Sequence, residues 1–553
     1  MITPTEERSL IDDLLAEQQK LTAVQRFARK HVAGALPAQS RYYRDLIPLQ
    51  KPAAGEQYAF AVDLDACTGC KACVSACHSL NGLDEDEIWR SVGLLHGGSV
   101  EEPYQQTVTT ACHHCEDPAC LNGCPVKAYE KDSDTGIVRH LDDQCIGCQY
   151  CILKCPYDVP KYSAKRGIVR KCDMCHSRLA ANEAPACAQA CPTSAISIRV
   201  VSRVEVRANT RPGTKMLPGA FDSSYTSPTT HYTSRRPSPA PSHGADAGHL
   251  RLEHAHWPLL LMLLLTQLSV GLFTVLAMGG GSSPGSSRIL SLGGFLALQA
   301  GLAVSVLHLG RPLGAWRAFL GVRTSWMSRE ILAFSLFAAC AGATLLAVWW
   351  SWIMETVPQL GRIAPSLQLQ PAASLLAWMT LLLGLAGIYC SAMIYIDTRR
   401  VLWRSGMTHW RFFGTALVLG LSAAACLLSW QQVSYPTASG TMIQTCILLA
   451  LAFRAALFGF EAIRFSQARR SKDTLDHRST RVVSERLPHL AISYALLCAG
   501  AVGCALLAMP FTGLAVAILS TLGFVFTFCA QLIERYTFFV AVVALRMPGG
   551  VAA

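Results

Sequence analysis

The sequence predicts a chain in two parts, a small α+β domain followed by an all-α polytopic membrane domain of eight transmembrane helices. Three observations predict this division. Sixteen of the 23 cysteines fall between residues 67 and 191, in a polar part of the chain. Beyond Trp257 the sequence consists of apolar runs that are each long enough to cross a bilayer. A Pro-, Ser- and Gly-rich stretch without periodicity separates the two parts.

The overall composition fits a membrane protein better than a soluble one. Hydrophobic residues make up 51% of the 553 residues and charged residues only 15%, whereas about a quarter of the residues in soluble proteins are charged. The net charge is +11, and in a membrane protein such an excess first reflects loop topology. No motif that interleaves aromatic and basic residues is present, so we predict no nucleic-acid partner.

The clustered cysteines form four groups of four. They are Cys67, Cys70, Cys73 and Cys77; Cys112, Cys115, Cys120 and Cys124; Cys145, Cys148, Cys151 and Cys155; and Cys172, Cys175, Cys187 and Cys191. The first and third groups match the C-x2-C-x2-C-x3-C run of bacterial ferredoxins, in which three thiolates bind one cubane and the fourth reaches the other cluster of the pair. We therefore predict an α+β ferredoxin-like domain with four [4Fe–4S] clusters.

Other uses of these cysteines fit the spacing less well. Zinc sites usually take one C-x2-C pair from each side, and disulfides are rare in a reducing compartment. A zinc-binding structural or sensory membrane protein is the alternative from another functional class. Four clusters would instead carry single electrons between two redox partners and catalyse no substrate chemistry. We thus expect a non-catalytic, electron-transfer subunit of an oxidoreductase complex.

Residues 58–200 resemble the electron-transfer subunit of complex molybdenum enzymes, of the dimethyl sulfoxide reductase B-subunit type. The segments VDLDACTGCKAC (62–73), CHHCEDPAC (112–120) and KCDMC (171–175) carry the resemblance. In that family the first cysteine group pairs with the fourth and the second with the third. The resemblance implies four ligand sets: Cys67, Cys70, Cys73 and Cys191 (cluster 1); Cys172, Cys175, Cys187 and Cys77 (cluster 2); Cys112, Cys115, Cys120 and Cys155 (cluster 3); and Cys145, Cys148, Cys151 and Cys124 (cluster 4). It also implies a molybdopterin-containing catalytic subunit on another polypeptide.

The changes in composition set the expected domain boundaries. We expect a partly helical N-terminal extension (1–57), the four-cluster domain (58–204), a flexible linker (205–255) and the membrane anchor (256–553). An amphipathic helix around Ser9–Lys30 would be either a packing helix or a docking element for the catalytic partner.

Eight apolar runs follow the linker. They cover residues 257–278, 289–310, 331–353, 372–396, 411–431, 441–463, 488–509 and 513–534. Arginine and lysine concentrate in the loops after runs two, four and six, and by the positive-inside rule these loops and both termini face the cytoplasm. The acidic start of the chain has no apolar signal segment. We therefore expect a multi-pass protein of the bacterial cytoplasmic (inner) membrane, with its iron–sulfur domain on the cytoplasmic side.

The membrane domain needs a redox partner for the clusters. The apolar runs contain His308 and, at a rim, His489, which is too few for a stack of b-type haems. Without haem, an electron cannot cross a hydrocarbon core of about 30 Å. We therefore predict no haem, and a partner from the membrane quinone pool that binds at the rim beside the clusters.

The loop between runs two and three carries the candidate quinone site. His308 ends run two and Glu330 begins run three, and a histidine that titrates near neutrality with a nearby carboxylate suits proton-coupled quinone chemistry. Arg311 or Arg329 could hold that carboxylate or stabilise negative charge on the quinone. Trp326 is either part of this site or an interface-belt residue.

The membrane half also resembles a known family. HLGRPLGAWRAF (308–319) and SWMSREI (325–331) are similar to the membrane-anchor subunit of dimethyl sulfoxide reductase, an eight-helix quinol-binding protein, and the resemblance covers roughly residues 257–545. In that family the His of HLGRP and the Glu of SREI are implicated in the quinone site, which implies that role for His308 and Glu330. The same segments argue against an anchor of the polysulfide reductase type. The departure is that two family subunits are fused here in one polypeptide.

Four charged residues lie inside the later apolar runs or at their ends. They are Arg454, Glu461, Glu534 and Arg535. Buried charges in a bilayer are usually paired, so we predict structural ion pairs between helices.

The predicted function follows from these parts. Electrons would pass between a molybdopterin site on the partner subunit, the four clusters and the quinone pool. A cytoplasmic cluster domain favours oxidation of sulfite made inside the cell, as in a sulfite dehydrogenase. The alternative is the same pathway run from quinol to a reductase for dimethyl sulfoxide or another S- or N-oxide.

Overall fold

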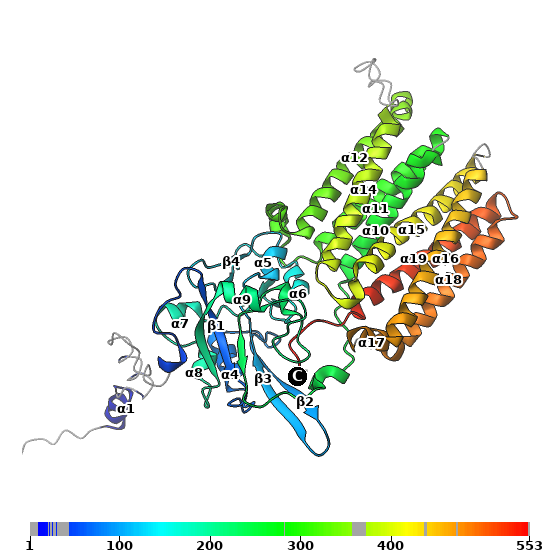
Figure 1. Ribbon diagram of the computed structural model, residues 1–553. Coiled ribbons are helices and arrows are strands. Elements are labelled where there is room, and N and C mark those ends of the chain that lie inside the picture. The colour runs from blue at the N-terminus through cyan, green and yellow to red at the C-terminus, as the bar shows by residue number, and fades with distance from the viewer. Residues whose placement is uncertain are drawn as a thin grey trace, which may run out of the picture.

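The computed structural model describes residues 9–19, 22, 25, 29, 44–280, 283–356, 372–435, 440–471 and 474–550. The first half of the helix expected around Ser9–Lys30 is α1 (Leu10–Gln19), and most of its second half lies outside the described residues. Two units follow, a cysteine-rich domain (residues 56–250) and a bundle of long helices, with the domain at one end of the bundle (Figure 1).

The cysteine-rich domain contains two three-stranded sheets and two short hairpins. The strands are β1 (Glu56–Asp63), β2 (Ser91–Gly98), β3 (Pro103–Thr110), β4 (Tyr129–Lys131), β5 (Val138–His140), β6 (Lys161–Ser163), β7 (Ile168–Arg170), β8 (Ile196–Ser202), β9 (His231–Thr233) and β10 (Ser242–Gly244). The sheet orders are β8-β1-β9 and β10-β2-β3, with β4-β5 and β6-β7 as separate pairs. Strand β1 is buried on both faces because Tyr58, Phe60 and Val62 alternate with the small Ala59 and Ala61.

Short helices begin within or directly after the cysteine loops. They are α4 (Ala72–Asn81), α5 (Ala119–Gly123), α6 (Tyr150–Lys154), α7 (His176–Ala180) and α8 (Ala186–Gln189). In the two ferredoxin-type runs, Gly69 and Gly147 adopt φ values of +75° and +70°. This left-handed conformation suits glycine and lets the chain turn tightly between the first two cysteines. The α+β ferredoxin-like domain predicted from the cysteine spacing is confirmed.

Residues 205–255 differ from the flexible linker that we expected. They contain most of α9 (Arg203–Asn209), together with η2 (Ser223–Tyr225), β9, β10 and η3 (Ala245–Gly248). Strand β9 pairs in parallel with β1, and β10 pairs antiparallel with β2. The segment therefore supplies edge strands to both sheets, because the unpaired edges of β1 and β2 offer it backbone hydrogen bonds. Its short strands have no apolar periodicity, which is why composition alone indicated a loop.

Within the described ranges, eight helices are long and apolar enough to cross a membrane, as predicted. They are α10 (Trp257–Val275), α11 (Pro284–Val306), α12 (Trp326–Thr356), α14 (Ala373–Ile396), α15 (Ser405–Ser434), α16 (Gly440–Arg470), α18 (Pro488–Ala508) and α19 (Leu514–Val540). Helix α10 is the most buried and packs on α11, α14, α15 and α19. Its Gly271 meets Gly420 of α15, where a Cβ atom on either residue would collide with the backbone of the other helix. Small residues permit this close approach in a membrane bundle.

The three basic loops all contact the cysteine-rich domain. Arg311 Nη1 donates to Asp142 O at 2.9 Å, and Arg478 Nη2 donates to Asp246 O at 3.0 Å. Arg400 Nη2 lies 3.5 Å from Ile152 O. The basic ends of the helices and the cysteine-rich domain are therefore on the same side of the bundle, as the charge pattern predicts.

The last described residues leave the membrane domain. After α19 the chain returns to the cysteine-rich domain, where Leu94 N donates to Gly549 O at 2.9 Å. Gly549 N donates to Asp246 Oδ1 at 2.8 Å, and Met547 is buried in the domain's core. The membrane anchor expected over 256–553 thus ends earlier, and the segment after α19 fastens the two units together.

Candidate functional site

The structure brings the cysteine groups together in sets of four. One cavity is lined by Cys67, Cys70, Cys73 and Cys191, and another by Cys112, Cys115, Cys120 and Cys155. Cys77 lies near Cys187 and Cys175. Burial is the main cause that raises the pKa of Cys77 to about 12, and the two neighbouring thiols add to the increase. Burial and then the neighbouring Cys124 and Cys145 likewise raise the pKa of Cys148. These groupings coincide with the four ligand sets implied by the resemblance; their role as iron ligands stays a prediction.

Backbone N–H groups point at the sulfur of one cysteine in several loops. Gly147 N lies 3.4 Å from Cys145 Sγ, and Met174 N lies 3.4 Å from Cys172 Sγ. Ala128 N donates to Cys124 Sγ at 3.2 Å, and Ala195 N donates to Cys191 Sγ at 3.3 Å. Such donors stabilise thiolate ligands and tune the potentials of iron–sulfur clusters.

Burial makes several of these sulfurs, Cys115 and Cys155 among them, poor thiolates without a cation. It raises the pKa of Cys155 to about 11 and that of Cys115 well above the ordinary value. A bound metal deprotonates a coordinating thiol outright. The four-thiol sets with inward N–H donors therefore fit iron–sulfur clusters, which would supply the positive charge that the buried thiolates require.

Two buried cations lie among the cysteines, and neither was among the predicted site residues. Lys171 Nζ donates to Cys172 O at 2.8 Å; burial alone would lower its pKa, but the nearby Cys112, Cys120 and Cys172 raise it. Arg90 is 2% exposed and packs on the ring of Phe60 at 4.7 Å. Lys171 adjoins a cysteine, but nothing in the sequence around Arg90 signals its position.

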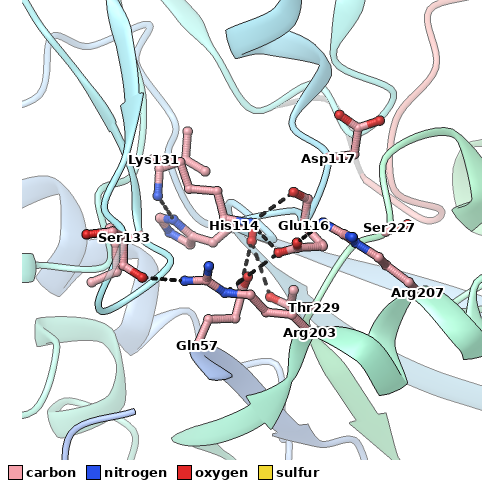
Figure 2. Close-up of polar contacts among 12 residues, drawn as sticks. Gln57, His114, Glu116, Asp117, Lys131, Ser133, Arg203, Arg207, Ser227 and Thr229 are labelled. Atoms are coloured by element: carbon pink, nitrogen blue, oxygen red, sulfur yellow. Dashed lines mark hydrogen bonds and ion pairs between the residues drawn. The ribbon is translucent and has the colours of Figure 1, made fainter. Parts of the chain in front are cut away.

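A charged cluster fixes α9 beside the second cysteine group. The carboxylate of Glu116, directly after Cys115, is 5% exposed and pairs with Lys131 (Figure 2). Arg207 Nη2 lies 2.5 Å from Glu116 Oε1, and Arg203 Nε lies 3.9 Å from Glu116 Oε2. The segment expected to be a linker thus helps to hold the cysteine loops in place.

The set around Cys145 adjoins the membrane domain. Cys124, Cys145 and Cys151 pack in one apolar cluster with Ala318, against which Leu309 and Ile331 also lie. The loop between α11 and α12 includes η5 (Pro312–Gly321) and follows the surface of this set. Arg311 N donates to Ile146 O at 3.1 Å, and Ser325 Oγ donates to Gly123 O at 2.7 Å.

Glycine permits the closest contact in this interface. A Cβ atom on Gly310 would collide with the carbonyl oxygen of Gly167, so only glycine lets the HLGRP segment rest on the cysteine-rich domain at this point.

His308 lies at the start of this loop and is half-buried. Its Nδ1 contacts Ser305 O, whereas its buried Nε2 has no hydrogen-bond partner among the described residues. Burial lowers the pKa of His308, and the bond to Ser305 opposes that shift. The imidazole is therefore neutral near pH 7, with one nitrogen open to a ligand.

Glu330 is the fifth residue of α12 and is 7% exposed. It is near Ser391, Tyr395 and Tyr150, on α14 and α6. Among the contacts between described residues, no hydrogen bond or ion pair joins Glu330 to His308. The structure thus places both at the end of the bundle beside the cysteine-rich domain without bringing them into direct contact.

The two arginines predicted to hold the carboxylate have other partners. Arg311 donates to Asp142 O, as described above. Arg329 Nη2 donates to Arg323 O at 2.7 Å, and its guanidinium lies 4.4 Å from the ring centroid of Trp326. Among the described residues neither guanidinium is ion-paired with Glu330, and the alternative that one of them stabilises negative charge on the quinone stays a prediction. Trp326 also packs edge-on against Tyr389 at 6.0 Å.

The interface also contains contacts that the sequence did not indicate. Tyr150 Oη donates to Ile394 O at 3.0 Å, and Lys154 Nζ lies 2.6 Å from Asp397 Oδ2. Tyr225 Oη donates to Asp397 O at 2.7 Å. Helix α6, which carries Cys151, is thereby joined to the end of α14.

The intramembrane charges form pairs, with partners that differ in part from expectation. Arg411 Nε lies 3.3 Å from Glu461 Oε1 and 3.2 Å from Glu534 Oε1, and Arg535 Nη2 lies 3.6 Å from Glu534 Oε2. Arg454 instead contacts hydroxyl and thiol groups on α19 and α18. Arg411, at the start of the fifth apolar run, was not among the charges for which we predicted an ion pair.

Comparisons with known proteins match both units. Residues 104–201 match the 4Fe-4S dicluster domain, and residues 252–540 match the DMSO reductase anchor subunit (DmsC). The B subunit of the anaerobic dimethyl sulfoxide reductase of Haemophilus influenzae is 35% identical over 172 residues, which is 30% of this chain and 83% of that protein.

Other relatives agree with this assignment. The corresponding B subunit of Escherichia coli is 36% identical over 172 residues, again 30% of this chain and 83% of that protein. The formate dehydrogenase-O iron-sulfur subunit of Escherichia coli is 32% identical over 173 residues, which is 28% of this chain and 57% of that protein.

Proposed function

The chain thus belongs to the DMSO reductase anchor subunit (DmsC) family, fused to an iron–sulfur domain of the B-subunit type, and from this premise we propose that it connects a molybdopterin subunit to the membrane quinone pool. The 16 cysteines of the four sets hold four [4Fe–4S] clusters, which carry single electrons when bound. This chain holds and orients the clusters and leaves substrate chemistry to its partner.

The observation that carries the proposal is the contact between the Cys145 set and the α11–α12 loop. That set packs against Leu309 and Ile331, and its helix α6 is joined to α14 through Tyr150 and Lys154. An electron acceptor bound at this rim lies beside one set and on the same side of the bundle as all four. Electrons that leave the clusters at this rim do not have to cross the bilayer, so their transfer to the acceptor needs no haem.

His308 and Glu330 are our candidates for holding the quinone. His308 Nε2 has no protein partner among the described residues. Because Nδ1 bonds to the Ser305 carbonyl, Nε2 of the neutral ring can accept a hydrogen bond from a quinol hydroxyl. Glu330, buried at the other helix end, can hold a proton that moves on or off the ring. Arg311, Arg329 and Trp326 shape the loop around this position through the contacts described above.

Sulfite oxidation is our preferred partner reaction, with reduction of dimethyl sulfoxide or another S- or N-oxide as the alternative. The basic loops touch the cysteine-rich domain, which supports a cytoplasmic orientation by the positive-inside rule. With the substrate and the quinone on one side, turnover separates no charge directly across the membrane.

Metal analysis tests the electron-transfer role. The purified protein should contain about sixteen iron atoms and as much acid-labile sulfide per chain. Zinc without sulfide would instead support a structural or sensory protein. In the complex with the catalytic partner, sulfite should bleach the visible absorbance of the clusters; bleaching by a quinol and recovery with dimethyl sulfoxide would favour the alternative direction.

A further inference from the structure

A separate cavity of about 510 Å³ opens at the same end of the bundle. Helices α15, α16, α18 and α19 form its walls, and α17 (Thr474–Arg481) contributes Asp476, Ser479 and Thr480. None of the described residues that line it belongs to the α11–α12 loop or to α12. The cavity is therefore distinct from the site proposed at His308 and Glu330.

Most of the cavity wall is apolar. Met407, Phe458, Ile533 and Phe538 line it from three different helices. Phe458 is 42% exposed and Ala495 also lies on the protein surface, so this side of the cavity opens where a bilayer would surround the bundle. A volume between about 300 and 1,000 Å³ with apolar walls and a few polar groups is typical of a small-molecule site.

The polar part of the cavity is a buried charge cluster with unused hydrogen-bonding capacity. Glu534 is 5% exposed, and neither carboxylate oxygen has a hydrogen-bond partner among the described residues, although Arg411 lies 3.2 Å away. Arg411 Nη1 and Glu461 Oε1 also lack such partners, and Tyr494 Oη donates to Glu461 Oε2 at 2.9 Å. Buried polar groups are normally satisfied, so donors and acceptors remain here for a ligand.

Packed aromatic rings connect this cavity to the Cys145 set. Tyr150, the residue before Cys151, donates to the carbonyl of Ile394. The neighbouring Tyr395 ring lies 5.2 Å from Phe538, and Phe538 lines the cavity. A ligand in the cavity thus contacts the aromatic cluster that also borders the iron–sulfur domain.

We propose that this cavity binds the head group of a second membrane quinone, with the tail leaving past Phe458 and Ala495. The inference rests on the proposed function, in which a quinone is the redox partner. A hydroquinone hydroxyl can donate to Glu534, and a quinone carbonyl can accept from Arg411. An anionic phospholipid headgroup fits less well, because two carboxylates, Glu461 and Glu534, already face Arg411 and would repel it.

Photolabelling of the full-length protein in lipid nanodiscs tests the proposal. The probe is an azidoquinone with a short isoprenoid tail, and mass spectrometry maps the labelled peptides. We expect label within residues 458–465, 490–495 or 533–538, and loss of that label when excess unmodified quinone competes. Ala495→Trp should fill the opening and reduce this label by roughly tenfold, which corresponds to about 1.4 kcal/mol of binding free energy.

Ala499→Trp is the matched control, because Ala499 lies on the same helix, is exposed and does not line the cavity. It should leave the label unchanged, as should His308→Ala. Label confined to residues 308–330 would overturn this inference and leave the proposed function intact. No quinone-protected label anywhere would contradict both. Competition by phosphatidylglycerol as strong as that by quinone would identify a lipid site and overturn the inference.

Discussion

Two regions at the domain-facing end of the bundle each contain a buried carboxylate, but they are built differently. The α11–α12 loop packs tightly against the cysteine-rich domain, and we call this contact the seam. In it Gly310 touches Gly167, and the backbone N–H of Arg311 donates to Ile146 O. The α15–α19 region is an open cavity whose Glu534 is held by Arg411. No ion pair within the described residues holds Glu330.

The difference separates two tasks that a membrane anchor must perform. The seam places one cysteine set close to the membrane domain and leaves His308 Nε2 open. The cavity instead has room for a ligand and contains the charged side chains Arg411, Glu461 and Glu534. The HLGRP segment could be recognised in the sequence because the close backbone contact at the seam requires specific residues such as glycine. The cavity needs only apolar side chains and dispersed charges, which leave no compact motif.

The largest effect should come from removing a cysteine of the set at the seam. Cys148→Ala should lower the iron content from about sixteen to about twelve per chain and abolish quinone-linked turnover, because the last carrier before the membrane is lost. Metal analysis and turnover with a soluble quinone analogue measure this. Cys504→Ala, on α18, is the control and should change neither. Unchanged iron in Cys148→Ala would show that this thiol is not a ligand.

Substitutions in the seam should slow quinone turnover while leaving the clusters in place. His308→Ala and Glu330→Gln should each reduce the rate by roughly 100-fold, the usual effect of losing a positioned proton carrier. Iron content and cluster absorbance should stay at the native level. Glu355→Gln, at the exposed far end of the same helix as Glu330, is the control. Native rates in both seam variants would place the quinone elsewhere, with the α15–α19 cavity as the next candidate.

The sequence could predict the architecture more fully than the site. The spacing of cysteines and the length of apolar runs are local properties, so the ferredoxin-like domain and the eight helices follow from them. The pairing of β9 with β1 and the return of Met547 to the cysteine-rich domain depend on contacts between distant segments. The same reason explains why Arg329 faces Trp326 rather than Glu330, and why Arg411 was not recognised as the partner of two glutamates.

A moderate effect on stability is expected at the ion pair that joins α6 to the end of α14. Lys154 is 5% exposed at its side chain and pairs with Asp397. Asp397→Asn should destabilise the interface by about 1.5–3 kcal/mol, because it removes a charged hydrogen-bond partner from a buried cation. Limited proteolysis between the two units should accelerate accordingly. The exposed pair Arg481–Glu485 offers the comparison, and Glu485→Gln should leave the proteolysis rate unchanged; equal effects would mean that Lys154 is not buried in the assembled protein.

The smallest effect should be the change of stability and of the quinone-linked rate as the pH falls below neutral. Burial lowers the pKa of His308 below its ordinary 6.5, so the folded protein holds a neutral imidazole at pH 7. As the pH falls below 6.5, the unfolded state takes up a proton first and stability declines. Below the folded pKa the protonated ring can no longer accept a proton from a quinol, so the rate measured in the direction of quinol oxidation should fall by up to about tenfold per pH unit.

A pH profile of native protein against His308→Gln, with iron content as a check on folding, measures this effect. Native protein should show the acid limb, and the variant should be slower and flat in the same range. His256, whose own pKa is lowered to about 4 by burial and then by His254 and His308, is a titratable neighbour of His308. A limb that persists in His308→Gln and disappears in His256→Gln would transfer the titration to His256 and leave the open Nε2 of His308 with a positioning role only.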